Sequence, residues 1–181
     1  MRLTLAPGVS FNEGKHEYFF KGKKLSGITS SVNKLLGLSY SSSFVEEHRV
    51  DGLHVHKAVQ LWIETGRPQS IHEGAVWIVN CLSPLLAKSS LYAEVLVSDF
   101  KSYASMVDIV EDTGNGLNIY DIKAGAFKRD SVTWQLSIYK YFIEKFSNYR
   151  VDKCICISVK DREFYKVFPK PFDKVEALLY A

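Results

Sequence analysis

The segment from Met106 to Gly125 constrains the fold most, because it places acidic residues inside two apolar runs. The runs Tyr103 to Val110 and Leu117 to Lys123 favour β-strands, and turn-forming residues lie between them at 113–116. Burying a carboxylate costs free energy unless a partner offsets it. We therefore predict two adjacent strands whose acidic residues face a partner or a ligand.

The register of these strands decides which side chains meet. With a two-residue turn at 114–115, Asp108 lies opposite Asp121. With the turn one residue later, Asp108 lies opposite Lys123 instead. Because side chains alternate along a strand, Asp121 and Lys123 share one face, and Asp108 lies on that face in either register.

Two carboxylates beside an ammonium group indicate a particular chemistry. They can bind a hard divalent cation through oxygen, with a charged donor close to the water that the cation activates. This arrangement predicts phosphoester hydrolysis. The alternative is a salt bridge between Asp121 and Lys123, with Asp108 on a solvated face of the sheet.

Two amphipathic helices add polar residues to this picture. In the first, Asp51 to Thr65, His56 lies beside the apolar stripe, where it either reaches a metal at the sheet edge or is an ordinary boundary residue. In the second, Ser131 to Phe146, Gln135 and Tyr139 are four residues apart and share a face. The pair can contact a phosphate or a base, and the alternative for Tyr139 is core packing.

The remaining pattern predicts a mixed α/β (α+β) domain with a central sheet. Its further elements are a hairpin at about 16–28, a brief helix ending at Gly37, a helix from Glu73 to Leu86, and strands at Leu91 to Val97, Val151 to Val159 and Glu163 to Phe168. With 181 residues, 46% of them hydrophobic, the chain is expected to form a single domain over 1–181.

Composition excludes several classes of protein. No apolar run approaches membrane-spanning length, and the opening residues lack a signal-peptide pattern, so we expect a cytoplasmic protein without a membrane segment. The three cysteines, Cys81, Cys154 and Cys156, form no CxxC spacing, which argues against a zinc or iron–sulfur site. A net charge of +3 names no ligand, so function depends on the motifs.

Taken together, these motifs resemble the PD-(D/E)XK nuclease superfamily, and more narrowly its RecB-like and phage exonuclease branch. The similar features, in order, are the run from His16 to Thr29, G-x-x-x-H from Gly52 to His56, Asp108, D-I-K at 121–123, and Q-x-x-x-Y from Gln135 to Tyr139. The resemblance implies a restriction-endonuclease-like central mixed sheet flanked by helices. The chain departs from the pattern at Gln60, where many relatives carry Glu.

The resemblance also implies roles for individual residues. The catalytic residues it implies are Asp108, Asp121 and Lys123, and the ligands of Mg²⁺ or Mn²⁺ are His56, Asp108, Asp121 and the backbone carbonyl of Ile122. Substrate contacts would come from Gln135, Tyr139, Lys128 and Arg129, with Glu94 as an auxiliary carboxylate. The alternatives are a solvated loop for the two basic residues and a solvated strand edge for Glu94.

The expected function is a metal-dependent DNA nuclease, more specifically an exonuclease, acting in DNA repair, recombination or phage DNA processing in a bacterial or phage-infected cell. DNA is the expected partner, and a helicase would be a separate protein because the chain has no Walker A motif. Two alternatives stay open. One is a nuclease fold with a weakened site that binds DNA or a protein without cutting, and the other is a purely structural domain.

Overall fold

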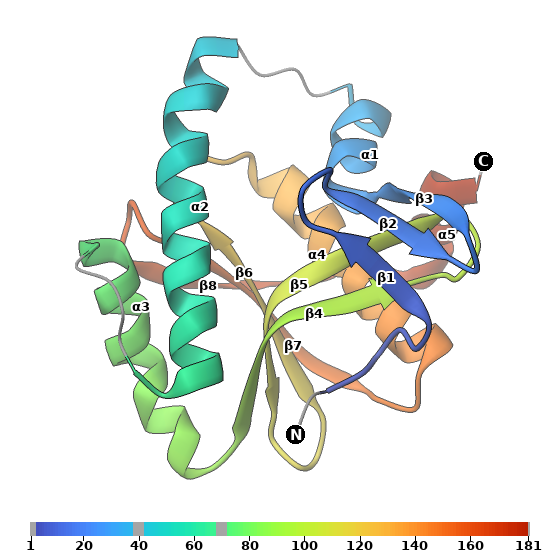
Figure 1. Ribbon diagram of the computed structural model, residues 1–181. Coiled ribbons are helices and arrows are strands. Elements are labelled where there is room, and N and C mark those ends of the chain that lie inside the picture. The colour runs from blue at the N-terminus through green and yellow to red at the C-terminus, as the bar shows by residue number, and fades with distance from the viewer. Residues whose placement is uncertain (1–2, 38–41, 68–71, 181) are drawn as a thin grey trace.

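The computed structural model describes residues 3–37, 42–67 and 72–180, and gives only the backbone for 42–51. In these ranges an eight-stranded mixed sheet carries helices on both faces (Figure 1). The predicted mixed α/β class with a central sheet is therefore confirmed. Among the described residues, no helix is long and apolar enough to cross a membrane.

The elements follow the chain in this order. The strands are β1 (Val9–Asn12), β2 (Glu17–Phe20), β3 (Lys23–Gly27), β4 (Ser90–Ser98), β5 (Tyr103–Asp112), β6 (Leu117–Lys123), β7 (Val151–Ser158) and β8 (Glu163–Val167). The helices are α1 (Ile28–Leu35), α2 (Ser42–Thr65), α3 (Glu73–Leu82), α4 (Arg129–Phe146) and α5 (Phe172–Tyr180), with a 3₁₀ helix η1 (Ser83–Ala87) after α3.

The predicted elements are all present, with differences at some ends. The helix expected to reach Leu86 ends at Leu82 and continues as η1, because Pro84 cannot donate the next backbone hydrogen bond of an α-helix. Helix α2 begins at Ser42 rather than Asp51. Strand β1 and helix α5 were not predicted, although Pro171 directly before α5 is a typical helix-start signal.

Two different strands pair with the same edge of β5. On that edge, residues 109–112 pair with β6 and residues 103–104 pair with β3. The opposite edge of β5 pairs with β4 alone, from Ser90↔Asp112 to Ser98↔Ala104. We call residues 105–108, the stretch of β5 between its pairings with β6 and β3, the fork. Figure 1 shows β5 and β6 diverging from each other here.

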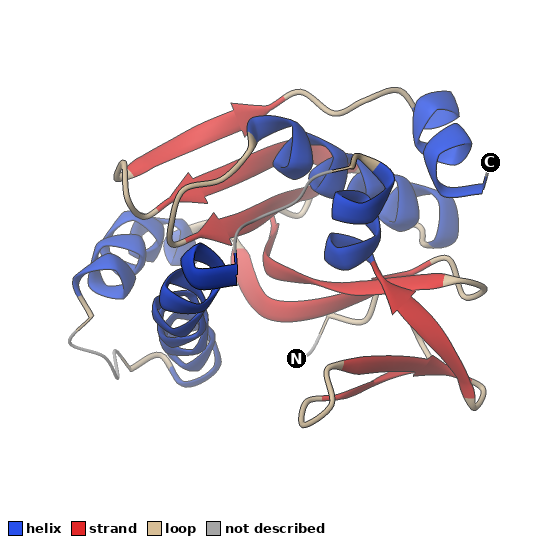
Figure 2. Ribbon diagram, turned by 90° about the horizontal axis from the view of Figure 1, so that it is seen from above, coloured by secondary structure: helices blue, strands red, loops and turns tan. Residues whose placement is uncertain are grey.

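The two faces of the sheet bury separate apolar clusters. Helices α1, α4 and α5 cover one face, packing around residues such as Val110, Ile119 and Cys156. Helices α2 and α3 cover the other face, around Ile109 and Ile122 (Figure 2). Successive side chains of β6 point alternately into these two clusters, so every residue from Leu117 to Ile122 is buried.

A carboxylate of β5 outside the fork, Glu111, has a structural role. Three groups donate hydrogen bonds to it, namely Ser89 Oγ (2.8 Å), Asn118 Nδ2 (2.7 Å) and Tyr120 OH (2.6 Å). Burial by itself raises the pKa of Glu111, but these donors hold that pKa below its usual value. The fold therefore favours the charged form.

We expect Glu111→Gln to lower the free energy of unfolding at neutral pH by about 2 kcal/mol, because the amide offers one acceptor oxygen and turns an NH₂ group toward donors. The folded-state pKa of Glu111 lies below that of the unfolded chain. Its stabilisation is thus complete above the unfolded-state pKa and is lost as the pH falls through the folded-state pKa. Urea unfolding of the wild type and of Glu111→Gln should show that the difference in their free energies of unfolding shrinks in acid. A difference that stays constant with pH would contradict this account.

Candidate functional site

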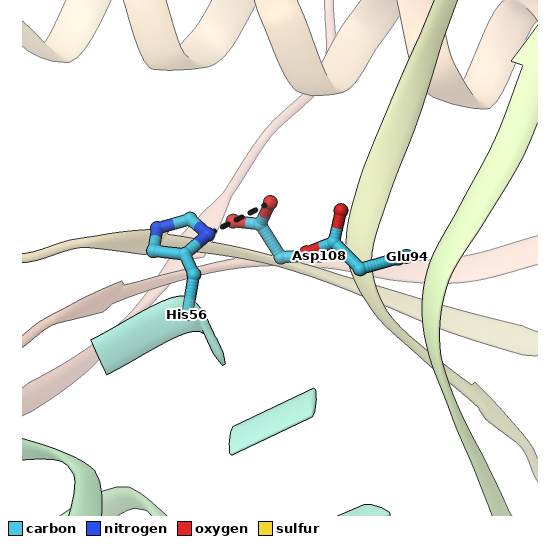
Figure 3. A group of neighbouring side chains, drawn as sticks. All are labelled: His56, Glu94 and Asp108. Carbon is cyan, nitrogen blue, oxygen red and sulfur yellow. Dashed lines mark ion pairs between the residues drawn. The ribbon is translucent and has the colours of Figure 1, made fainter. Parts of the chain in front are cut away.

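Three side chains with metal-binding donor atoms meet beside the fork. They are His56 of α2, Glu94 of β4 and Asp108 of β5, and one donor atom of each lies within 4.8 Å of the others (Figure 3). We call them the donor cluster. Their elements are far apart in sequence, so the sheet and α2 together create this convergence.

Helix α2 brings His56 over the end of β6. The His56 Nε2 atom lies 3.1 Å from the carbonyl oxygen of Ile122, and Nδ1 lies 3.4 Å from Asp108 Oδ1. One turn earlier, a Cβ atom on Gly52 would be only 3.8 Å from the Cβ of Ala124. The glycine of the G-x-x-x-H motif therefore faces the end of the D-I-K strand.

The predicted strand register is confirmed for the turn at 114–115. The observed pairs run from Asp112↔Leu117 to Ile109↔Tyr120, where the pairing ends. The same register extended by one residue would set Asp108 opposite Asp121, and the charge of Asp108 does act on Asp121. Asp108 Oδ2 accepts a hydrogen bond from the backbone N–H of Ile122 at 2.6 Å. The carboxylate thus spans the fork and holds the end of β6.

Glu94 has an unusual backbone for a residue within a strand. Its neighbours pair as Ala93↔Ile109 and Val95↔Val107, which places Glu94 across from Asp108. Its φ of +51° lies in the left-handed region, which costs a residue with a side chain about 1–3 kcal/mol. Strain of this kind persists where the surrounding structure enforces it and is typical of functional sites.

A second group of polar residues lies next to the donor cluster. Lys123 Nζ is 2.8 Å from Asp121 Oδ2 and 3.1 Å from Oδ1. Gln135 Nε2 donates to Asp121 Oδ1 at 2.7 Å and lies 2.7 Å from Tyr139 OH, while Gln135 Oε1 accepts from Lys123 Nζ at 3.3 Å. Ser105 of the fork lies 3.0 Å from Tyr139 OH.

One oxygen in this group lacks a hydrogen-bond partner. Asp121 is almost completely buried, with 1% of the residue exposed. Its Oδ2 atom is near the ammonium group of Lys123 but accepts no hydrogen bond of acceptable geometry from the described residues. An unsatisfied buried carboxylate oxygen is costly, and a bound cation is one way to satisfy it.

The pKa values follow from burial and close charges. Burial alone lowers the pKa of His56, but the charges of Asp108 and Glu94 raise it to about 9. Burial and repulsion by Asp108 raise the pKa of Glu94 to about 7. Burial also raises the pKa of Asp121 despite Lys123, whereas the nearby His56 keeps that of Asp108 low against the effect of burial.

The structure agrees in part with the alternatives to a functional site that the sequence left open. The ion pair between Asp121 and Lys123 exists, but Asp108 is not on a solvated face, since only 14% of its side chain is exposed. Tyr139 is buried, as its core-packing alternative requires, and its hydroxyl also joins the polar group. The carbonyl of Ile122, an implied ligand, is engaged by His56.

The two basic residues expected to contact the substrate, Lys128 and Arg129, lie apart from the donor cluster. Lys128 is the N-cap of α4 and Arg129 its first residue, and both are exposed. The Arg129 guanidinium stacks over the ring of Tyr165, with 5.1 Å to the ring centroid. The structure places them at the end of the segment that follows Lys123, rather than against the carboxylates.

Sequence reasoning missed two residues at the fork. Ser105 contacts Tyr139, and Tyr18 of β2 lies close enough for the charges of Glu94 and Asp108, together with the larger effect of burial, to raise its pKa to about 12. A small polar residue within an apolar strand was the available signal for Ser105. Tyr18 belonged to the run from His16 to Thr29 but was given no role, because its position beside the carboxylates depends on the pairing of β3 with β5.

Comparisons with known proteins add little to this geometry. No family model matches the chain, and no curated protein matches it. A solved structure described as the crystal structure of SSO0001 is similar, with 16% sequence identity and a TM-score of 0.44. That match covers 88% of this chain and 75% of the other.

Proposed function

We propose that this chain is a metal-dependent nuclease that hydrolyses phosphodiester bonds in DNA. The observation that carries the proposal is the convergence of His56, Glu94 and Asp108, with the buried ion pair of Asp121 and Lys123 close enough for the charge of Asp108 to act on it. Oxygen and imidazole donors grouped in this way suit a divalent cation such as Mg²⁺ or Mn²⁺. The order and spacing of the motifs, similar to those of PD-(D/E)XK nucleases, support the same proposal.

The residues present fit such a cation. His56, Glu94 and Asp108 would hold it, since one donor atom of each lies within 4.8 Å of the others. Asp121, which is close enough to feel the charge of Asp108, would be a further ligand. When bound, the ion would act as a Lewis acid toward the phosphate and lower the pKa of a bound water. Burial is the larger cause of the raised pKa of Glu94, and a cation would relieve the second cause, its repulsion by Asp108.

The chain's own residues have separate tasks in this proposal. Lys123 keeps its positive charge, because Asp121 and Asp108 raise its pKa against the opposite effect of burial. With 24% of its side chain exposed, its ammonium group can orient a water or offset charge on a phosphate. Gln135 and Tyr139 hold Asp121 in place through the chain of hydrogen bonds that ends at Ser105.

Further details of the proposal depend on the resemblance. It favours an exonuclease that works in DNA repair, recombination or phage DNA processing in the cytoplasm of a bacterial or phage-infected cell. Its protein partner would be a separate helicase or recombination protein. Lys128 and Arg129, exposed at the start of α4, would contact the phosphate backbone. The chain retains Asp108, Asp121 and Lys123, which favours cleavage over a binding module that has lost its chemistry.

The test is cleavage of end-labelled linear and closed circular DNA with Mg²⁺, Mn²⁺ or EDTA. We expect the wild type to cut linear DNA only with a divalent cation, and Asp121→Ala to lose both cleavage and the rise in melting temperature caused by that cation. Sparing of circles would establish dependence on ends. Binding of DNA without cleavage under every condition would instead favour the binding module.

A further inference from the structure

Three pairs of a cationic and an aromatic side chain lie where helix α4 meets strand β8 and the segment that follows it. The pairs are Arg129 with Tyr165, Lys166 with Phe168, and Lys170 with Trp134, with 5.1, 5.2 and 5.6 Å from the cationic group to the ring centroid. We call these six residues the basic–aromatic seam. Because such pairs occur about once in 70–80 residues, three of them together mark a surface that presents positive charge and rings side by side.

The seam is continuous along the first half of α4. Arg129 is the first residue of this helix, and Ser137 lies eight residues, or about 12 Å, further along its axis. The backbone N–H of Lys170 donates to Ser137 Oγ at 2.8 Å. The chain from Tyr165 to Lys170 therefore runs beside this part of the helix, which brings the three pairs to one surface.

One end of the seam lies close to the candidate site. Tyr165 pairs with Cys156, which pairs with Asp121, so two strand spacings, or about 10 Å, separate Tyr165 from Asp121 across the sheet. The segment from Lys123 to Arg129 spans the same gap, and the ring of its Phe127 lies 6.3 Å from that of Tyr165. A DNA strand with a phosphate at Lys123 would reach the seam with its next few nucleotides.

The seam offers both kinds of contact that a single strand needs. Phe168 is 74% exposed, and Tyr165 and Trp134 are half-buried, so ring surface is open to bases. The Tyr165 hydroxyl donates to Asp161 at 3.2 Å, which orients this ring. A guanidinium that lies flat on a ring, as that of Arg129 does, keeps the N–H groups at its edge for phosphate oxygens.

We propose that the basic–aromatic seam binds single-stranded DNA, with bases stacked on its rings and phosphates beside its cations, and that the chain therefore acts on single strands in preference to duplexes. The bases of a single strand can unstack and lie on aromatic rings, whereas those of a duplex are held against one another. This inference rests on the proposed function, which supplies DNA as the ligand. The seam lies outside the donor cluster, so binding to it requires no divalent cation.

The test measures binding by fluorescence anisotropy in EDTA, where no cleavage occurs. The dye-labelled probes are a thymidine oligonucleotide, an abasic strand of the same length and charge, and a duplex of that length. Because the abasic strand keeps the phosphates and lacks the bases, the comparison isolates stacking. We expect the wild type to bind the thymidine strand roughly tenfold more tightly than the abasic strand, and more tightly than the duplex.

Phe168→Ala should weaken binding of the thymidine strand roughly tenfold and leave binding of the abasic strand unchanged. Since Phe168 is mostly exposed, the melting temperature should not change. The matched control is Tyr149→Ala, which removes an exposed ring beyond the other end of α4 and should leave both affinities unchanged. Lys166→Gln should weaken binding of both strands and reduce the dependence of log affinity on log salt by about 0.7.

Several results would overturn the inference. They are equal affinities of the wild type for the thymidine and abasic strands, tighter binding of the duplex, an equal loss for both strands in Phe168→Ala, the same loss in Tyr149→Ala, an unchanged salt dependence in Lys166→Gln, and no measurable binding of DNA.

The two proposals can fail separately. If the thymidine strand is preferred and Phe168→Ala removes that preference, but no DNA is cut with any cation, the seam is supported and the nuclease proposal is wrong. If cation-dependent cleavage occurs equally on single strands and duplexes, and Phe168→Ala binds as the wild type does, the nuclease proposal is supported and the seam inference is wrong.

Discussion

Asp108→Asn is expected to reduce cation-dependent cleavage of DNA at least about a thousandfold, or roughly 4 kcal/mol of activation free energy. Asp108 faces Glu94 and His56 with one oxygen and accepts the Ile122 N–H with the other. An asparagine oxygen can still accept that backbone hydrogen bond, so the end of β6 should stay in place. The negative charge that attracts a cation is lost.

The measurement pairs initial cleavage rates with the melting temperature during titration of Mg²⁺ or Mn²⁺. The matched control is Asp112→Asn, the same change on the same strand, where the carboxylate also accepts one backbone hydrogen bond, from the Gly114 N–H at 2.9 Å. We expect this control to keep the cation-induced rise in melting temperature. Cleavage by Asp108→Asn within tenfold of the wild type would show that the donor cluster is not the metal site.

Much of the site could be predicted because it depends on strand periodicity. The alternation along 117–123 and the turn at 114–115 determine that Asp108, Asp121 and Lys123 share a face, and the observed register agrees. The four-residue spacing of Gln135 and Tyr139 likewise places both side chains on one face of α4, where Gln135 Nε2 donates to Tyr139 OH at 2.7 Å. These relations are local, so a sequence contains them in full.

The rest depends on contacts between distant segments. The division of the sheet at β5 requires β3 to pair with β5 across some 75 residues of intervening chain, and no local pattern specifies that pairing. The left-handed backbone of Glu94 and a groove lined by β4 are likewise features that no local sequence pattern specifies. Glu94 therefore looked like a strand-edge residue in the sequence and is a member of the donor cluster in the structure.

The division also explains why polar residues collect at this point. Between its pairings with β3 and β6, the edge of β5 lacks a neighbouring strand, so side chains take over the hydrogen bonds of the backbone. The N–H of Ile122 bonds to Asp108, and its carbonyl faces His56. The same gap that breaks the ladder of hydrogen bonds thus brings the polar side chains together at one place.

Lys123→Met is expected to lower the free energy of unfolding by about 3–5 kcal/mol, because it leaves Asp121 as a buried charge without its cationic partner. Methionine keeps much of the length and apolar contact of the lysine stem. Gln135 would still donate to Asp121 Oδ1 at 2.7 Å, but Oδ2 would lose the ammonium group now 2.8 Å away. Urea unfolding without divalent cations measures this cost.

The double variant Lys123→Met with Asp121→Asn provides the control, since it removes the isolated charge and should recover most of the lost stability. Adding Mg²⁺ or Mn²⁺ should raise the melting temperature of Lys123→Met more than that of the wild type, because a competing positive charge is gone while the carboxylates remain. Cleavage should nevertheless fall, because no ammonium group faces the phosphate. A single variant as stable as the wild type, or a double variant no more stable than the single one, would show that the Asp121–Lys123 pair does not hold the fork together.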